Sequence, residues 1–350
     1  MPKSKENSCG EKRTEIWQGK EDGDVSGRPA IEFRNVSKRY GNAARYAVAD
    51  VNIHIDEGSF ITILGTSGSG KTTFLKMVNR IYEPTAGEIF YFGKCIKQLN
   101  LKEYRRKIGY VIQQIGLFPH MTVEENIGII PQILKWDKTK IASRVQELLE
   151  LVCLSPEDFK KRYPRQLSGG QQQRVGLARA MAADPDLLLM DEPFGAVDAI
   201  TRQKLQEELL CLQRQMNKTI LFVTHDVGEA FKLGDKIVVM HEGRIQQFGS
   251  PYELLTRPVN AYVARLLATQ DVVQRLKLLK AQEVMVPAGS LPHDRVLRVS
   301  KDESLHNILT YFLEHDQSHV LVEDERQNVV GKISWEQLKD STRPGKILSA

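Results

Sequence analysis

The sequence predicts an α/β fold, in which helices flank a mostly parallel sheet. Apolar runs of strand length at 60–64, 187–190 and 219–223 alternate with segments of helical periodicity. This order is expected when helices connect parallel strands. A glycine-rich segment, GTSGSGKTT at 65–73, stands between the first of these strands and an apolar helical segment at 74–78. A strand, a glycine-rich loop and a helix in this order indicate a nucleotide-binding core.

The composition is that of a folded protein with more than one domain. The 350 residues, 41% of them hydrophobic, suffice for a large core, and we expect two domains. Lysine and arginine number 49 against 44 acidic residues, and the net charge of +5 is too small to support nucleic-acid binding as the main activity. The four cysteines, Cys9, Cys95, Cys153 and Cys211, are far apart, so we expect free thiols in a reducing cytosol.

The N-terminus and the apolar runs bear on location. No apolar run approaches the roughly 18 residues that span a bilayer. The N-terminus is charged and lacks the apolar segment of a secretory signal. Residues 1–29 are polar and charged, and we expect them to be disordered. We therefore expect a cytosolic protein, or one held at a membrane by its partners.

The elements expected along the chain follow from its periodicity. Alternating or apolar runs predict strands, glycine- and proline-containing turns separate them, and apolar residues at i, i+3, i+4 and i+7 predict helices. The expected strands are 31–36, 51–55, 60–64, 88–92, 107–112, 187–190, 219–223, 237–240 and 244–246, the last two forming a hairpin. The expected helices are 74–78, helical periodicity over 122–154, a helix opened by 167–171, and 201–216.

The glycine-rich segment predicts a site for nucleotide phosphates. Its spacing is G-x-x-x-x-G-K-[ST], in which glycines let backbone N–H groups turn inward and the helix N-terminus attracts anions. We expect Lys71 to reach the β- and γ-phosphates of ATP or GTP, and the Thr72 hydroxyl to ligate Mg²⁺. A simple Gly/Ser turn before a helix is the alternative. The segment consists of Gly65, Thr66, Ser67, Gly68, Ser69, Gly70, Lys71, Thr72 and Thr73.

Two acidic residues follow the apolar strand at 187–190. Asp191 and Glu192 stand at its carboxyl end, where α/β sheets bind ligands. Asp191 suits Mg²⁺ through a water molecule, and Glu192 suits general-base activation of the attacking water. A strand that ends in two solvated acids is the alternative.

A second glycine-rich segment, LSGGQ at 167–171, opens a helix and forms a second anion site from Ser168, Gly169, Gly170 and Gln171. One nucleotide cannot use both segments of one chain if they face different ways, so a partner chain must complete the site. With these motifs the sequence resembles the ATP-binding subunits of ABC transporters over residues 30–262. The resemblance implies a P-loop ABC-type ATPase core with a helical subdomain. It also implies a head-to-tail dimer, with two ATP molecules each held between the phosphate loop of one subunit and the LSGGQ segment of the other.

The roles known in that family carry over to residues that match its motifs. Tyr40 matches the aromatic residue that stacks on adenine, and an ordinary strand-edge tyrosine is the alternative. Gln113 matches the glutamine that senses Mg²⁺ and the attacking water, and we prefer it to Gln114 by its distance from the strand. Asp198 matches the loop that links the two sites across the dimer. His225 matches the histidine that contacts the γ-phosphate, and a bland surface histidine is the alternative.

The resemblance thus implies ATP and Mg²⁺ as cofactors. The implied catalytic residues are Lys71, Gln113, Glu192 and His225, and the implied Mg²⁺ residues are Thr72, Gln113 and Asp191.

Three stretches, 108–127, 131–136 and 198–209, narrow the resemblance to the importers of quaternary amines such as glycine betaine, carnitine, choline or proline betaine. This implies a homodimer beneath permease subunits, a separate substrate-binding protein, and a peripheral place on the cytoplasmic face of the inner (plasma) membrane. An importer of amino acids or another small solute is the nearest alternative. A soluble ABC protein of translation or DNA repair is an alternative of another class, but its usual second motif set or zinc insert is not visible.

The C-terminal part shows a linker, 263–294, and a small α+β region, 295–350. The segment 272–280 is helical and basic on one side, so it bridges two domains or lies on a membrane surface. Strands at 296–299, 319–322 and 329–333 and helices at 304–313 and 335–340 resemble one regulatory motif of the cystathionine-β-synthase (CBS) type, with 279–285 as its entry segment.

Such motifs normally pair, and this chain has room for one. The apolar strand residues Val320, Val322 and Val330 then leave a sheet face that needs a covering partner, so we expect pairing across the dimer. Nucleotide-binding members carry Asp three residues after the Ser or Thr that ends the last strand, whereas here Gln337 follows Ser334 at that spacing. Nucleotide binding, ionic-strength sensing and a structural role stay open.

Overall fold

The structure, a computed structural model, describes residues 29–112, 116–195, 197–268, 276–277, 279–287, 296–315, 318–326 and 328–341. The tail before Pro29, the segment 113–115 with Gln113 and Gln114, and much of the predicted linker lie outside these residues. Among the helices that are described, none is both long enough and apolar enough to cross a membrane.

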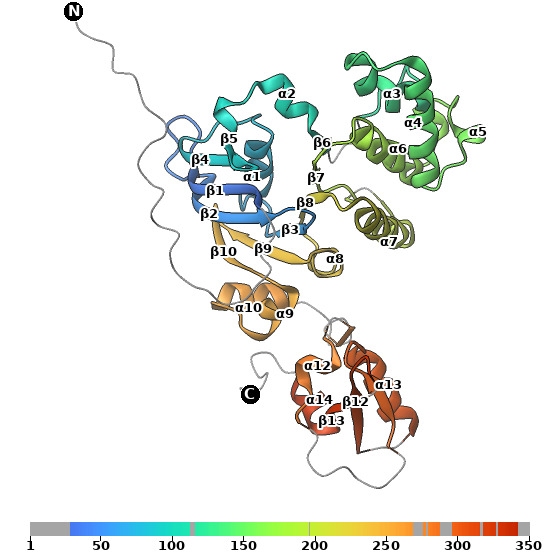
Figure 1. The fold of residues 1–350 in the computed structure, drawn as a ribbon. Coiled ribbons are helices and arrows are strands. Elements are labelled where there is room, and N and C mark those ends of the chain that lie inside the picture. Colours follow the sequence, from blue (N-terminus) through green and yellow to red (C-terminus); the bar gives the residue numbers. More distant parts are fainter. Residues whose placement is uncertain are drawn as a thin grey trace, which may run out of the picture.

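The core is a six-stranded sheet of order β10-β9-β3-β8-β7-β6 (Figure 1). Its strands are β3 (Phe60–Leu64), β6 (Ile108–Val111), β7 (Leu187–Asp191), β8 (Thr219–Thr224), β9 (Lys236–His241) and β10 (Arg244–Gly249). All neighbours pair in parallel except the β9–β10 hairpin. Strands β3 and β8 are buried along their whole length, as expected when both faces of a parallel sheet are covered. The predicted α/β class is confirmed.

A second, antiparallel sheet packs over the first helix. Its order is β2 (Val48–Asp56), β1 (Pro29–Lys38), β4 (Ala86–Tyr91) and β5 (Lys94–Cys95). Helix α1 (Lys71–Val78) links the two sheets, because Phe74 stacks on Phe33 of β1 at 4.4 Å between ring centroids and shares a buried cluster with Ile63 of β3. A 3-10 turn, η1 (Ile96–Gln98), and α2 (Leu101–Arg106) lead from this sheet to β6.

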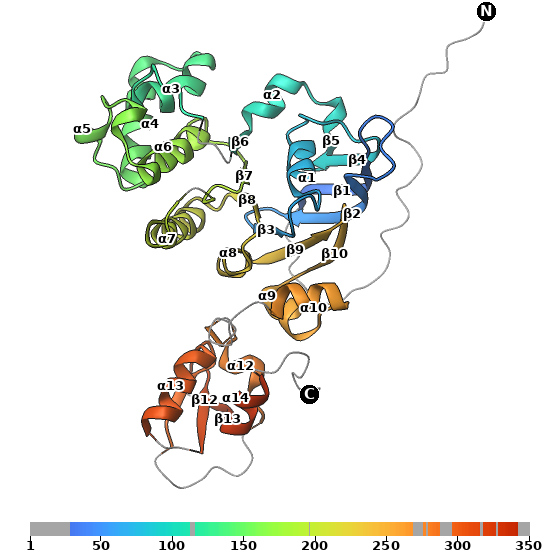
Figure 2. The ribbon, with the colours of Figure 1, turned by 180° about the vertical axis from the view of Figure 1, so that it is seen from behind.

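A group of helices lies between β6 and β7 in the chain and forms the helical subdomain. It comprises α3 (Val123–Ile133), α4 (Lys138–Leu151), α5 (Pro156–Phe159), the 3-10 turn η2 (Pro164–Gln166) and α6 (Gly169–Met181). Both views place the subdomain beyond the β6 edge of the sheet (Figures 1 and 2). The helical periodicity predicted over 122–154 is interrupted after Ile133. The helix restarts at Lys138, because the Asp137 carboxylate accepts a 2.8 Å hydrogen bond from the Thr139 N–H and caps it.

Four further helices complete the core: α7 (Ala199–Met216), α8 (Val227–Leu233), α9 (Pro251–Thr256) and α10 (Ala261–Ala268). Of these, α7 was expected, whereas α8, α9 and α10 were not. Helices α9 and α10 bury Leu254, Leu255 and Val263 against β3 and β9. They also lie next to the C-terminal region, since the Tyr252 hydroxyl donates a 3.4 Å hydrogen bond to the Glu283 carbonyl.

The C-terminal region contains α12 (Ala281–Val284), β11 (Arg298–Ser300), α13 (Leu305–His315), β12 (His319–Glu323), β13 (Val329–Ser334) and α14 (Trp335–Ser341). The sheet order is β11-β12-β13, so the predicted strand, helix, strand, strand, helix pattern is confirmed. The expected uncovered sheet face is wrong for Val320 and Val322, which are 1% and 0% exposed. Both lie in a cluster with helical residues of the same region, including Phe312 and Leu338. Of the three valines, Val330 is the exposed one, at 38%.

Candidate functional site

The segment 65–73 forms the loop between β3 and α1, and its lysine lies over the loop backbone. The Lys71 ammonium donates hydrogen bonds to the carbonyls of Gly65 (2.8 Å) and Thr66 (3.0 Å). Burial lowers the pKa of Lys71, and the carboxylates of Glu192 and Asp191 oppose that shift. A charged ammonium held this way lies ready for an anion that can replace the two carbonyls.

Two glycines of the loop are required by the packing around it. Gly70 has φ of 103°, and a Cβ there would lie 2.3 Å from the Ala47 carbonyl oxygen. A Cβ on Gly65 would lie 2.3 Å from the Met240 carbonyl oxygen. Thr66, Ser67 and Gly68 are exposed, whereas the Ser69 hydroxyl is buried and has no hydrogen-bond partner among the described residues. An exposed loop at a helix N-terminus with an unused buried hydroxyl fits a phosphate group.

The two acids after β7 meet this loop. The Thr72 hydroxyl donates a 3.0 Å hydrogen bond to an Asp191 carboxylate oxygen, so two hard oxygen donors of the kind that Mg²⁺ prefers lie side by side. Burial raises the pKa of Asp191, and the hydrogen bond from Thr72 opposes that shift. The alternative of two solvated acids therefore does not hold for Asp191, which is half-buried.

Glu192 occupies a backbone conformation that side chains rarely adopt. Its φ is 46°, in the left-handed region, which costs a non-glycine residue about 1–3 kcal/mol. The Glu192 N–H donates to the Val223 carbonyl (3.0 Å), and this bond helps to hold the turn. The turn brings a Glu192 carboxylate oxygen to 3.2 Å from Nδ1 of His225. His225 is exposed, with 63% of its side chain accessible, but it contacts Glu192 and so is not an isolated surface histidine.

Tyr40 lies beside the far end of the loop. Its hydroxyl is 3.2 Å from the Thr73 hydroxyl, and its ring packs edge-on against Tyr82 with centroids 5.4 Å apart. The Lys38 ammonium lies 5.4 Å from the Tyr40 ring centroid. Tyr40 is nonetheless 42% exposed, so its ring offers a free surface next to the loop. Sequence reasoning missed Tyr82 and Lys38, and for Tyr82 no local signal could have revealed a contact 42 residues along the chain.

The LSGGQ segment lies apart from this loop. Ser168 caps α6, with its hydroxyl accepting from the Gln171 N–H (3.3 Å) and the Gln171 side chain accepting from the Ser168 N–H (3.0 Å). Ser168 and Gly169 are exposed, and a Cβ on Gly169 would meet nothing within 4 Å. Helix α6 belongs to the helical subdomain and α1 to the core, and both views separate the two helices (Figures 1 and 2).

Asp198 lies close to the LSGGQ segment through the helix that it caps. Its carboxylate accepts a 3.0 Å hydrogen bond from the Thr201 N–H at the start of α7, and hydrogen bonds at this helix end lower the pKa of Asp198. A Cβ on Gly170 would lie 2.7 Å from the Thr201 methyl group. The structure therefore brings Lys71, Thr72, Asp191, Glu192 and His225 together, and places Ser168, Gly169, Gly170, Gln171 and Asp198 in a second group.

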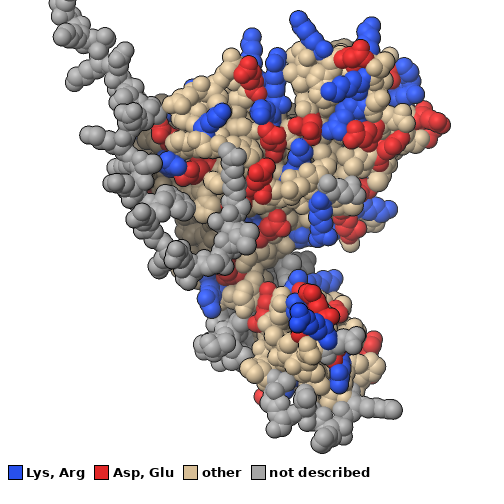
Figure 3. Space-filling view, in the orientation of Figure 1, with Lys and Arg blue, Asp and Glu red and all other residues tan. Residues whose placement is uncertain are grey.

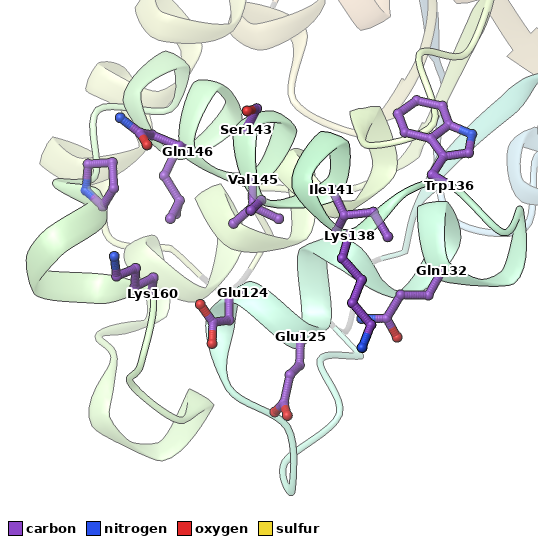
Figure 4. Close-up of a pocket in the computed structure, with 13 residues that line it drawn as sticks. Glu124, Glu125, Gln132, Trp136, Lys138, Ile141, Ser143, Val145, Gln146 and Lys160 are labelled. Carbon is purple, nitrogen blue, oxygen red and sulfur yellow. The ribbon is translucent and has the colours of Figure 1, made fainter.

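Of the hollows in the described part of the chain, two bear on the helical subdomain. One of about 380 Å³ includes Tyr110, Phe118 and Arg179, with the 61%-exposed Ile133 on its wall. The other, of about 760 Å³, lies in the helical subdomain (Figure 4). There Glu124 pairs with Lys161 at 2.6 Å and Glu125 caps α3 together with Thr122, so these acids already have partners. Basic and acidic side chains are interspersed over the face seen in Figure 3.

Comparison with known proteins identifies relatives of the chain. The family described as "ABC transporter" matches residues 48–195. "Carnitine transport ATP-binding protein OpuCA" of Listeria monocytogenes serotype 1/2a (strain 10403S) is 46% identical over 308 residues, which are 88% of this chain and 76% of that protein. "Glycine betaine/carnitine/choline transport ATP-binding protein OpuCA" of Bacillus subtilis (strain 168) is 45% identical over 319 residues, 91% of this chain and 82% of that protein.

A solved structure supports the fold. It is titled "Dimeric structure of a post-hydrolysis state of the ATP-binding cassette MJ0796 bound to ADP and Pi". The match has a TM-score of 0.57 and 36% identity, and covers 63% of this chain and 98% of that one.

Proposed function

The chain belongs to the ABC transporter family as an ATP-binding subunit that couples ATP hydrolysis to transport, and from this we propose that it powers uptake of a quaternary ammonium osmoprotectant such as glycine betaine, carnitine or choline. The observation that carries the substrate class is identity of 45–46% to such subunits over about nine-tenths of the chain.

The contacts around the loop support a separate role for each of these residues in ATP hydrolysis. Lys71 exchanges its two carbonyl partners for the β- and γ-phosphates of ATP, and the N–H groups of the loop bind the remaining oxygens. Thr72 and Asp191 would hold Mg²⁺, and the ion would neutralise phosphate charge. Glu192 accepts the proton of the attacking water. His225, 3.2 Å from that carboxylate, orients it and reaches the γ-phosphate. Tyr40 stacks on adenine, and Gln113 senses Mg²⁺ and the attacking water.

The active form that we propose is a head-to-tail homodimer. Ser168, Gly169, Gly170 and Gln171 form a helix N-terminus on the helical subdomain, and the exposure of Ser168 and Gly169 favours use of this anion site by the ATP of a second copy. Asp198 neighbours the same helix end through Thr201, so it suits a link between the two sites.

The dimer acts, in this proposal, beneath two permease subunits at the cytoplasmic face of the inner membrane, with a separate substrate-binding protein delivering the solute. The hollow near Tyr110 and Phe118, with exposed Ile133 beside it, offers an apolar surface for a permease segment. We assign the C-terminal region a regulatory role of the CBS type. Gln337 caps α14 by accepting a 2.7 Å hydrogen bond from the Ser334 N–H, and this use of Gln337 argues against nucleotide binding there.

Solute uptake by cells tests the proposal. A strain that lacks this chain is given radiolabelled glycine betaine, carnitine, choline or an amino acid, and is complemented with the wild-type chain or with Lys71→Ala. We expect loss of uptake of at least one quaternary amine, restored by wild type and not by Lys71→Ala, with amino-acid uptake unchanged. Unchanged uptake of all three amines together with lost amino-acid uptake would assign the chain to the other class of importer.

A further inference from the structure

A pair of stacked rings connects α10 to the end of β9. The imidazole of His241, the last residue of β9, stacks on the phenol of Tyr262, the second residue of α10, with centroids 3.8 Å apart and planes at 24°. The chain just before α10 is tied to the same hairpin, because Asn260 donates a 3.0 Å hydrogen bond to the Gln246 side chain and the Val259 N–H donates one of 3.1 Å to Gln247. Helix α10 and the two residues before it therefore hold the hairpin at the end of β9 and along β10.

The turn of this hairpin packs against the phosphate-binding loop. The Gly243 N–H donates a 3.0 Å hydrogen bond to the Ser69 carbonyl. At Gly65 the approach is too close for a side chain, because a Cβ there would lie 2.3 Å from the Met240 carbonyl oxygen. A Cβ on Gly70 would lie 3.4 Å from the Gly243 Cα, which is ordinary van der Waals contact. The backbone of the loop thus rests on residues 240–243, and their position helps to set the position of its N–H groups.

The two stacked rings carry polar atoms that take no part in the stack. Nδ1 of His241 and the hydroxyl of Tyr262 are both buried, and neither has a hydrogen-bond partner among the described residues. Buried polar atoms without partners are costly, so phenylalanine would be the more stabilising residue at either position. The feature that bears on the loop is the aromatic contact itself, which has a defined geometry and which a phenylalanine would keep. His241 lies two residues before Gly243, so this contact adjoins the turn that is hydrogen-bonded to the loop.

We propose that His241 and Tyr262 are positioning residues for the phosphate-binding loop, and that through them α10 sets the affinity for ATP from outside the nucleotide site. The inference rests on the proposed binding of ATP phosphates by residues 65–73. If the hairpin turn no longer holds the loop, binding of ATP must order the loop. The free energy of this ordering raises the bound ground state and the transition state equally. Loss of the stack therefore raises KM for ATP and leaves kcat nearly unchanged.

Three variants of the full-length chain test the inference by steady-state ATP hydrolysis. Tyr262→Leu keeps an apolar but smaller side chain and removes the stack, Tyr262→Phe keeps the ring, and Leu255→Ala removes a buried side chain from the same cluster while leaving the stack in place. We expect Tyr262→Leu to raise KM for ATP about threefold to tenfold, the range expected for an aromatic pair, with kcat within about twofold. Tyr262→Phe should keep the wild-type KM. Leu255→Ala should lower the melting temperature without changing KM.

Several outcomes would overturn the inference. The two rings would have no positioning role if KM is unchanged in folded Tyr262→Leu. The same conclusion would follow if KM rises equally in Tyr262→Phe or in Leu255→Ala. If Tyr262→Leu does not fold, His241→Leu makes the same comparison from the other ring, with His241→Phe as its conservative control. Direct binding of a fluorescent ATP analogue to Lys71→Ala distinguishes a failure of the proposed phosphate-binding role of the loop from a failure of the positioning role of the two rings. Undiminished binding there would remove the phosphate role of the loop itself, whereas lost binding with a normal Tyr262→Leu would remove only the positioning role.

Discussion

Replacement of Glu192 by glutamine tests the chemistry most directly. Gln is nearly the same size as Glu and retains one oxygen that can accept a hydrogen bond from His225, now 3.2 Å from the carboxylate. The left-handed turn at Glu192 is held by backbone bonds, including that from the Glu192 N–H to the Val223 carbonyl, and these do not depend on the side chain. The variant should therefore fold and keep the loop, Lys71 and Thr72 in place.

The expected loss follows from the function that is removed. An amide cannot accept the proton of the attacking water, and loss of a general base costs roughly 10²–10⁴ in rate. At 1.36 kcal/mol for each factor of ten, this is about 3–5 kcal/mol of transition-state stabilisation. Binding of ATP should be unchanged or tighter, since one negative charge near the phosphates disappears.

Two measurements on the same preparation decide the outcome. Phosphate release measures turnover, and size-exclusion chromatography with ATP and Mg²⁺ detects the ATP-bound dimer that should accumulate when hydrolysis stops. His225→Ala serves as a companion, because it removes the neighbour and leaves the base. Turnover within about threefold of wild type in Glu192→Gln would refute the assignment of the general base. Lost turnover together with lost ATP binding would mean that the side chain supports the site rather than the chemistry.

Three further changes have defined outcomes. In the proposed dimer, Ser67→Cys and Ser168→Cys should crosslink between chains when ATP is present. Both residues are exposed, whereas Ser69 is 2% exposed and suits a crosslink poorly. Crosslinks confined to one chain would contradict the head-to-tail arrangement. Tyr104→Phe removes a 2.5 Å hydrogen bond to the Val78 carbonyl at the end of α1 and leaves that acceptor buried, so urea unfolding should show a loss of about 1–3 kcal/mol, and an unchanged midpoint would contradict it. Removal of the residues after 268 should leave ATP hydrolysis by the transporter intact and flatten its response to salt or nucleotide; the same dependence in both forms would make the C-terminal region structural.

The parts of the fold that could be predicted depend on short stretches of sequence. Buried parallel strands such as 60–64 and 219–223 are continuous apolar runs, and their positions were predicted closely. The break between α3 and α4 was missed. It depends on a single left-handed residue, Lys135 with φ of 57°, followed by the cap at Asp137, and neither interrupts the apolar periodicity. The apolar periodicity shows which face of a helix is buried. It does not reveal a turn after which the apolar residues continue at the same spacing.

In the site and the C-terminal region, too, features set by local sequence could be predicted, and contacts between distant elements could not. Motif spacing was sufficient to predict that Thr72 and Asp191 meet, because the carboxyl ends of parallel strands share one edge of the sheet. It could not reveal the stack of His241 on Tyr262, since contacts between distant elements depend on how those elements pack. For Val320 and Val322 the apolar pattern correctly predicted burial but could not say what buries them. Helices of the same region do so, and no second chain is needed.

The cap of α6 affects how easily the proposed dimer opens again. Ser168 already bonds the Gln171 N–H at 3.3 Å, one of the N–H groups that a phosphate arriving at this helix end would bind. In the proposed dimer, docking of the partner's ATP would therefore be an exchange of acceptors, and the free energy gained would be the difference between a strong bond to a charged oxygen and a long bond to a hydroxyl. When the phosphate leaves, the Ser168 hydroxyl can accept from the Gln171 N–H again, so this donor would have a partner in both states. Opening of the proposed dimer would then cost less free energy than if this donor were left without a partner.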